Sequence, residues 1–70
     1  MIRVSVISTE LRSIGYDEES STLEVEFHRR GTYQYFGVTK ETYLELMSAS
    51  SKGRYFNSWI RDAYAYRRVA

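Results

Sequence analysis

Alternating hydrophobic and polar residues over positions 22–28 constrain the fold of this chain more than any other feature. One side of this segment is apolar and the other is polar, as alternate positions show: Leu23, Val25 and Phe27 against Glu24, Glu26 and His28. A period of two is typical of a half-buried β-strand. Arg29-Arg30-Gly31 predicts a short hairpin loop in which Gly31 takes a positive φ, and residues 32–38 return as the next strand. The sequence therefore predicts an antiparallel hairpin with one face toward a core.

Weaker strand signals precede this hairpin. Residues 10–16 are predicted to form a strand that leads into a polar turn at residues 17–21. Residues 1–9 alternate only briefly, and we expect either an edge strand or a loose arm there. The expected sheet is therefore a small antiparallel meander of about three strands.

Two short helices are predicted to follow the strands. Thr39 is the expected N-cap of the first, whose apolar stripe comprises Tyr43, Leu44, Leu46 and Met47. The second is expected over about residues 54–63, with one wide apolar stripe made of Tyr55, Phe56, Trp59, Ile60 and Ala63. We therefore expect Trp59 in the core, with Trp59→Ala costing roughly 3–5 kcal/mol. Residues 64–69 form either a short strand or a fraying tail. The fold class is α+β, with the helices packed on one face of the meander.

The length and composition of the chain exclude several classes of protein. Seventy residues allow one domain, 1–70. There is no cysteine and one histidine, so a disulfide framework and a thiolate or two-histidine zinc site are excluded, and no metal or other cofactor is expected. No apolar run approaches the ~20 residues of a membrane span, and the N-terminal stretch lacks the apolar region of a signal peptide. We therefore expect a cytoplasmic protein without a membrane partner.

Charge is distributed unevenly along the chain. Residues 1–28 carry two basic and six acidic residues, for a net charge of −4, whereas residues 29–70 carry eight basic and three acidic residues, for +5. Eight of the ten basic residues are arginine, which suits forked contacts to phosphate and carboxylate groups. Two interpretations stay open, a solvated dipolar surface and an anion-binding face on the C-terminal half.

The candidate ligand-binding residues are basic, polar or aromatic side chains of that C-terminal half. They are Arg54, Asn57 and Arg61, spaced to share one polar helix face, then Tyr66, Arg67 and Arg68, with Arg29 and Arg30 extending the surface. Arginines of this kind contact phosphates, and a tyrosine ring stacks on a base. For Asn57 and Arg61 the alternative is a structural hydrogen bond.

The aromatic run at residues 33–36 also allows two interpretations. Beside Arg29 and Arg30, its rings could form a stacking platform for single-stranded RNA. In the alternative, which we favour, Tyr33 and Tyr35 pair with Val25 and Phe27 on the inner face of the sheet and Phe36 faces outward.

Catalytic arrangements find little support in the sequence. Glu24 and Glu26 share a strand face, but no acid or base partner accompanies them. The chain also has no glycine-rich phosphate loop. We therefore expect that it is not an enzyme.

These residues also give the chain a resemblance to the KTSC domain family, a domain at the C-terminus of some lysyl-tRNA synthetases and a free-standing small bacterial protein. The similar segments are 13–17, 23–27, 31–38, 51–57, 60–61 and Tyr64, and together they span about Val6 to Val69. Thr39 and Ala65 stand where proline is common in the family, and Ala65 leaves the end of the second helix open. The resemblance implies RNA binding, which has been suggested for the family from its association with synthetases.

The leading hypothesis is a small non-catalytic binding module that binds nucleic acid, RNA in preference to DNA, through a basic C-terminal face. The alternative is a protein–protein interaction module or a homodimer that uses an exposed sheet edge or exposed aromatic residues. The two differ in whether the arginines gather on one face beside exposed rings.

Overall fold

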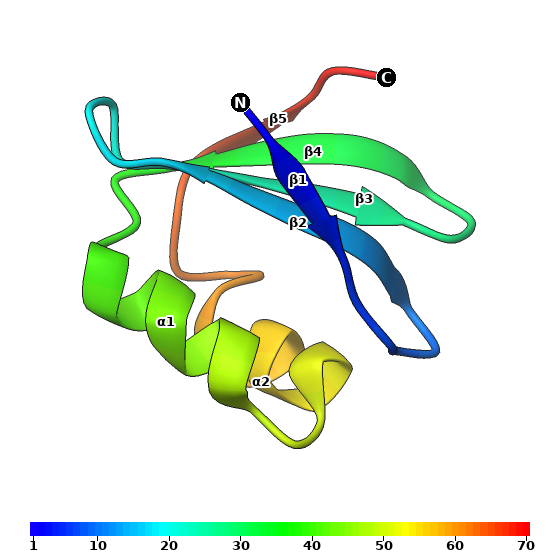
Figure 1. Cartoon of the computed structure of the whole chain (residues 1–70). Helices are drawn as coiled ribbons and strands as arrows, with labels where there is room; N and C mark the ends of the chain where they lie inside the picture. The colour runs from blue at the N-terminus through cyan, green and yellow to red at the C-terminus, as the bar shows by residue number, and fades with distance from the viewer.

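A computed structural model describes residues 1–70 as a five-stranded antiparallel sheet with two helices on one face (Figure 1). The elements are β1 (Arg3–Ser5), β2 (Leu11–Asp17), β3 (Thr22–Phe27), β4 (Gly31–Phe36), α1 (Lys40–Ser48), α2 (Lys52–Trp59) and β5 (Tyr66–Arg68). The strands lie in the sheet in the same order as in the sequence. Both helices are inserted between β4 and β5, so the chain leaves the sheet, crosses one face and returns to add the last strand. The predicted α+β class is confirmed.

The predicted number of strands, about three, is wrong because both ends of the chain add a strand. β1 pairs with β2, with Arg3 opposite Gly15, so the edge-strand alternative holds for three residues of segment 1–9. β5 pairs with β4, with Tyr66 opposite Tyr35. Each of these strands has only three residues, too few for the alternation to decide between a strand and a loose end, and the strand alternative holds for both ends of the chain. Their existence depends on the partner strand that supplies the hydrogen bonds.

The central hairpin is as predicted. Gly31 has φ 90° in the turn between β3 and β4. Tyr33 lies opposite Val25, and Tyr35 lies opposite Leu23 rather than Phe27. Tyr35 is buried and Tyr33 packs against the core, which confirms that both rings face inward. Phe36 is 37% exposed on the other side.

The core lies between the central strands and the two helices. Its buried hydrophobic residues are Leu11, Ile14, Leu23, Val25, Phe27, Tyr35, Val38, Leu46, Phe56 and Ile60. Phe56 of α2 is the central ring, because Phe27 and Tyr35 meet it edge-on with centroids 5.3 and 5.2 Å away. One aromatic side chain of a short helix therefore packs at the centre of the core, against the rings of the sheet.

Both helices begin with a side-chain cap. The Thr39 hydroxyl oxygen accepts a hydrogen bond from the Thr42 amide at 3.2 Å, which confirms the predicted N-cap of α1. Ser51 caps α2 in the same way, through the Arg54 amide at 3.3 Å. α2 therefore begins two residues earlier than predicted and ends at Trp59, four residues earlier. Neither helix is long and apolar enough to cross a membrane.

The apolar stripes of both helices are narrower than predicted. Trp59 is 65% exposed, so its assignment to the core is wrong. Phe56 faces the sheet, and Ile60, four residues later, takes the next buried position, which leaves Trp59 on the flank of the helix. Ala63 is exposed because the helix has already ended. On α1, Leu44 is 52% exposed and Leu46 alone is fully buried.

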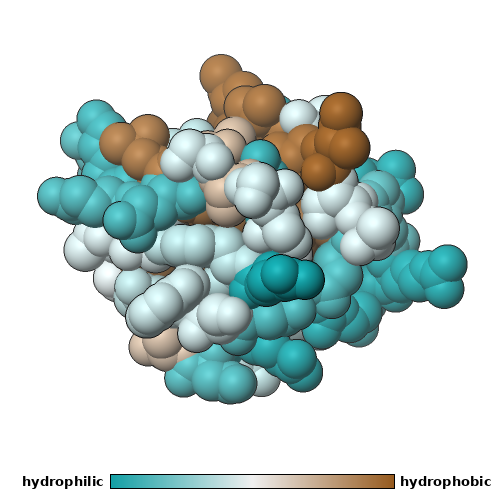
Figure 2. Space-filling model, turned by 90° about the horizontal axis from the view of Figure 1, so that it is seen from below, coloured by the Kyte–Doolittle hydropathy of each residue, from teal (hydrophilic) through white to brown (hydrophobic).

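Exposed apolar residues accompany the β1 edge of the sheet. Ile2 is 88% exposed, Val4 49% and Ile7 fully exposed. Seen from the helix side, most of the surface is polar, and apolar side chains gather along one rim of the molecule (Figure 2). β1 has no strand on its outer side, so this edge is free to pair.

The sheet face away from the helices carries paired charges. Glu24 accepts a hydrogen bond from Gln34 Nε2 at 2.8 Å and lies 3.6 Å from the Arg3 guanidinium. Glu26 accepts one from Ser13 at 2.9 Å and lies 3.9 Å from Arg12. The acidic residues of the N-terminal half are thus partly neutralised on this face, and Tyr33 and Tyr35 are not on it.

Candidate nucleic-acid interface

A pocket of about 200 Å³ opens beside β5, on the sheet face that carries the helices. Three separate segments line it, the β3–β4 hairpin, the turn after α2, and β5: Phe27, Arg30, Tyr33, Tyr35, Arg61, Asp62 and Tyr66. We call this the arginine–tyrosine pocket. Tyr66 pairs with Tyr35 and shares its side of the sheet, yet it is 58% exposed, so no element covers this end of the sheet.

Aromatic rings form one wall of the arginine–tyrosine pocket. The Tyr66 ring lies 5.9 Å from the Tyr33 ring and 5.5 Å from the Tyr35 ring, measured between centroids. Tyr33 in turn meets Phe27 edge-on at 5.7 Å. Tyr33 and Tyr35 thus support the Tyr66 ring from one side and leave part of its surface open to solvent. An exposed ring on a rigid aromatic base suits stacking with a nucleic-acid base.

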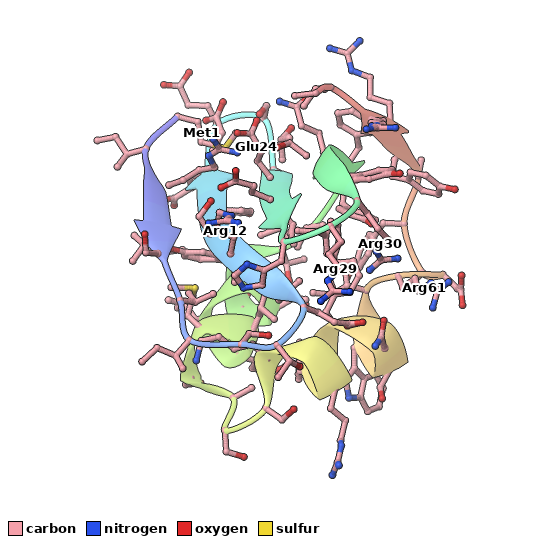
Figure 3. All side chains as sticks on the ribbon, turned by 90° about the vertical axis from the view of Figure 1, so that its right-hand side faces the viewer. Met1, Arg12, Glu24, Arg29, Arg30 and Arg61 are labelled. Carbon is pink, nitrogen blue, oxygen red and sulfur yellow. The ribbon has the colours of Figure 1, made fainter.

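The side chains of two arginines reach the pocket, Arg30 from the turn between β3 and β4 and Arg61 from the turn after α2 (Figure 3). The guanidinium carbon of Arg30 lies 4.3 Å from the centroid of the Phe27 ring, a cation–π contact, and one of its nitrogens lies 4.0 Å from the Glu10 carboxylate. Arg61 follows α2, where its amide donates to the Phe56 carbonyl at 3.0 Å, and its guanidinium has no carboxylate within 4.0 Å. Arg30 is therefore held in place, whereas Arg61 keeps an unpaired positive charge.

The Tyr35 hydroxyl responds to this environment. Burial raises the pKa of the Tyr35 phenol to about 12, although the charges of Arg30 and Arg61 act in the opposite direction. Tyr33 and Tyr66 raise the pKa further. The phenol therefore keeps its proton, and remains a hydrogen-bond donor, to about pH 12.

Arg68 is a fourth predicted residue that lies close to this site. It faces Tyr33 across the β4–β5 pair, and its Nε donates to the Ala70 carbonyl at 2.8 Å. A Cβ atom added at Gly31 would meet the Arg68 guanidinium at 2.9 Å, so Arg68 rests against the hairpin turn next to Arg30. The structure thus brings together Arg30, Arg61, Tyr66 and Arg68.

The other predicted residues lie elsewhere. Arg67 projects on the opposite sheet face, opposite Gln34. Arg29 borders a separate hollow with Thr9 and His28. The predicted common helix face of Arg54, Asn57 and Arg61 is wrong, because α2 ends at Trp59 and Arg61 lies in the turn beyond it.

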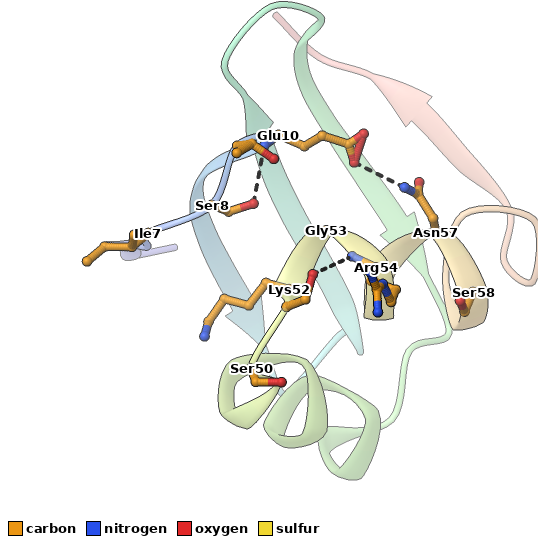
Figure 4. Close-up of a pocket in the computed structure, with 11 residues that line it drawn as sticks. Ile7, Ser8, Glu10, Ser50, Lys52, Gly53, Arg54, Asn57 and Ser58 are labelled. Carbon is orange, nitrogen blue, oxygen red and sulfur yellow. Dashed lines mark hydrogen bonds between the residues drawn. The ribbon is translucent and has the colours of Figure 1, made fainter.

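Arg54 and Asn57 line a second, larger groove of about 530 Å³ between the β1–β2 loop and α2 (Figure 4). Asn57 Nδ2 donates to Glu10 Oε1 at 3.1 Å, which is the structural hydrogen bond given as the alternative for this residue. Gly53 faces Glu10 and Ser8, and a Cβ there would lie 3.4 and 3.6 Å from their side-chain oxygens. Glu10 therefore contacts two elements, α2 through Asn57 and the β3–β4 hairpin through Arg30.

Sequence reasoning left four residues of the arginine–tyrosine pocket out of the candidate set. Tyr33, Tyr35 and Phe27 were assigned to the core, where they do pack, but they also form the pocket wall. Asp62 was not among the candidate residues, although it follows directly after Arg61 in the sequence. The neighbouring Arg61 was the one available signal, since residues that follow a helix end can turn toward the same cavity.

Comparison with known proteins identifies relatives of about the same length as this chain. The sequence profile of the KTSC domain matches residues 7–64. An uncharacterized protein of Stutzerimonas stutzeri is 43% identical over 70 residues, which are 99% of each chain. The crystal structure of a KTSC domain protein from Yersinia pestis superposes with a TM-score of 0.97 at 40% identity, covering 99% of this chain and 97% of the other.

Other relatives are much longer proteins. A lysine–tRNA ligase of Nostoc punctiforme is 28% identical over 60 residues, and one of Trichormus variabilis is 32% identical over 60 residues. The match covers 86% of this chain but 11% of each ligase. The chain is therefore similar to one small part of these ligases.

Proposed function

This chain belongs to the KTSC domain family, and we propose that it is a small non-catalytic module that binds single-stranded RNA through the arginine–tyrosine pocket. One observation carries the proposal: Arg30 and Arg61, from distant segments, meet the exposed ring of Tyr66 in a single cavity. Arginines neutralise phosphates, and aromatic rings stack on unpaired bases.

The charges of the folded chain support this assignment. Four basic residues lie within 4.0 Å of a carboxylate: Arg3, Arg12, Arg30 and Lys40. Among the other arginines of the C-terminal half, Arg29, Arg54, Arg61 and Arg67 have no such partner, and Arg68 donates to the main-chain oxygen of Ala70. Of these, Arg61 and Arg68 lie at or beside the pocket, where their positive charge can attract a phosphate backbone.

The choice of RNA as ligand rests on the relatives. Two lysine–tRNA ligases contain a segment similar to this chain, and their names place tRNA among their substrates. An accessory segment with a basic pocket suits contact with such a substrate. A cysteine-free chain also suits a reducing compartment, so we place the activity in the cytoplasm.

The test is a charge reversal with a matched control. Arg30→Glu/Arg61→Glu removes both pocket arginines, whereas Arg29→Glu/Arg54→Glu makes the same change in net charge from neighbouring surface positions. We expect the pocket variant to bind a short single-stranded RNA at least about tenfold more weakly than the control variant, since hydrogen bonds to charged groups contribute about 1.5–3 kcal/mol. Fluorescence anisotropy measures the affinities, and circular dichroism checks that both variants are folded.

An equal loss of RNA affinity in the two variants would show that RNA binding is not localised to the pocket. Absence of RNA binding by the wild-type chain at about 50 mM salt, where phosphate contacts are strong, would contradict the proposed function.

The second candidate function is a protein-binding module or homodimer, which the free β1 edge with exposed Ile2 and Val4 favours. Apolar residues beside an unpaired strand are typical of an interface. A wild-type chain that does not bind RNA and sediments as a dimer would support this candidate.

A further inference from the structure

Asp62 is the one acidic residue that lines the arginine–tyrosine pocket, and phosphate binding does not explain it. It is exposed, it makes no side-chain hydrogen bond, and its carboxylate lies more than 4.0 Å from the nitrogens of Arg30 and Arg61. A carboxylate in a site that received only phosphates would repel them. Its position therefore indicates a ligand that presents hydrogen-bond donors as well as negative charge.

We infer that the arginine–tyrosine pocket receives one unpaired guanine nucleotide of the RNA, an inference that rests on the proposed function. Asp62 accepts hydrogen bonds from the N1–H and N2–H groups of the base. An ionised carboxylate has two acceptor oxygens and no donor. Guanine is the one standard base whose Watson–Crick edge offers two adjacent N–H donors. Adenine and cytosine place a ring-nitrogen acceptor beside their amino group, and uracil places its N–H between two carbonyls.

The remaining groups of the pocket complement the rest of a guanine nucleotide. O6 and N7 of guanine are a pair of acceptors that an arginine contacts with two nitrogens. Arg30 suits this role because the Phe27 ring and Glu10 hold it in place. Arg61, which has no carboxylate partner, suits the phosphate. Tyr66 supplies the stacking surface, since 58% of it is exposed above Tyr33 and Tyr35.

The size of the pocket agrees with one base rather than a longer segment. Its volume of about 200 Å³ is below the roughly 300–1,000 Å³ of pockets that enclose drug-sized ligands. A single base can enter, while the neighbouring nucleotides follow the surface toward Arg68, next to the hairpin turn.

The experiment compares short single-stranded RNAs that differ at one base. An oligouridine of about eight nucleotides is measured against the same chain with one central guanine, adenine or cytosine. We expect the guanine RNA to bind about tenfold more tightly than oligouridine, the size of effect that one bidentate base contact provides. Asp62→Asn should abolish this preference and leave the affinity for oligouridine unchanged or higher, because the substitution removes a negative charge. Glu41→Gln, an exposed change of the same charge on α1, should keep the preference.

Separate outcomes distinguish the inference from the proposed function. RNA binding with equal affinity for all four bases, or a guanine preference that survives Asp62→Asn, would overturn the guanine inference and leave RNA binding intact. Absence of binding to every RNA would contradict the proposed function itself. Guanosine monophosphate is the second probe, and we expect it to compete weakly. Competition as strong as that of the guanine RNA would overturn RNA as the source of the nucleotide.

Discussion

Tyr35 belongs to the core and to the pocket wall at once. It is 4% exposed and meets the Phe56 ring edge-on at 5.2 Å. Its hydroxyl lies in the field of Arg30 and Arg61, yet burial dominates and raises the pKa of the phenol to about 12. Ionisation of this one group therefore links the stability of the fold to the site.

The raised pKa of Tyr35 predicts a loss of stability at high pH. In the unfolded chain the phenol ionises near pH 10, whereas in the folded chain it keeps its proton to about pH 12. The unfolded state therefore binds fewer protons between these values, and the free energy of unfolding falls as the pH rises through that window. Denaturation at a series of pH values should show a steeper fall for the wild type than for Tyr35→Phe.

Tyr55 is the internal reference for this measurement. Burial, together with the 2.7 Å hydrogen bond from its hydroxyl to Glu45, raises the pKa of Tyr55 to about 12 as well. Tyr55 is present in both proteins, so its contribution cancels in the comparison. Identical slopes for wild type and Tyr35→Phe would refute the assignment.

Trp59 is predicted to contribute little to stability. Because it is 65% exposed, Trp59→Ala should lower the free energy of unfolding by less than about 1 kcal/mol. Phe56→Ala, which removes the fully buried ring of the same helix, should cost roughly 3–5 kcal/mol. Thermal melting of the two variants checks this, and a similar drop in Tm for both would show that Trp59 is covered.

At the scale of elements, the short strands depend on close backbone contact with their neighbours. Backbone pairing with β4 continues beyond the end of β5 at Arg68. The Val69 amide donates to the Thr32 carbonyl at 2.8 Å, and the Thr32 amide donates to the main-chain oxygen of Ala70 at 3.3 Å. Gly31 lies directly beneath this segment, because a Cβ there would be 2.5 Å from the Ala70 carbonyl oxygen. The absence of a side chain at Gly31 therefore lets β5 dock.

Alanine substitutions at two glycines test this contact. Gly31 and Gly37 have φ values of 90° and 77°, so both substitutions introduce backbone strain of about 1–3 kcal/mol. A Cβ at Gly37 meets nothing within 4 Å, whereas one at Gly31 collides with Ala70 and Arg68. Gly31→Ala should therefore be the more destabilising, and it should accelerate hydrogen exchange of the Val69 amide. Equal effects of the two substitutions would mean that β5 shifts to accommodate the methyl group.

At the scale of the whole molecule, the two sheet faces separate the charges. Glu24 and Glu26 are paired on the face without helices, whereas Arg30, Arg61 and Arg68 lie around the pocket on the other face. Figure 3 shows Glu24 and Arg12 apart from Arg30 and Arg61. The carboxylates of Glu24 and Glu26 therefore do not oppose the approach of a negatively charged ligand to the pocket side.

This separation predicts the salt dependence of RNA binding. If Arg61 and Arg68 neutralise about two phosphates, the logarithm of the binding constant should fall against the logarithm of salt concentration with a slope of about −1.4. Arg68→Gln should reduce the slope by about 0.7. Arg12→Gln, on the opposite face and paired with Glu26, should leave the slope unchanged. A slope near zero would show that phosphate contacts do not drive binding.

Features that depend only on neighbouring residues could be predicted from the sequence. Alternation over residues 22–28 identified β3, and Gly31 identified the turn. Thr39 was recognised as a helix cap because its hydroxyl bonds an amide three residues later. The family was also within reach of the sequence, since its motifs are local segments in a set order. The candidate residues were identified only in part, as basic and aromatic side chains of one half of the chain.

The tertiary structure alone decided which of those side chains meet. The sequence left residues 64–69 open between a short strand and a fraying tail, and pairing with β4 decides for the strand. In this strand Arg68 lies on the pocket side and Arg67 on the other, because side chains of successive strand residues alternate. The end of α2 at Trp59 turned Arg61 and Asp62 toward Tyr66. These placements depend on parts of the chain about thirty positions apart, since Arg30 and Arg61 line the same pocket. A local sequence pattern carries no information about such distant neighbours.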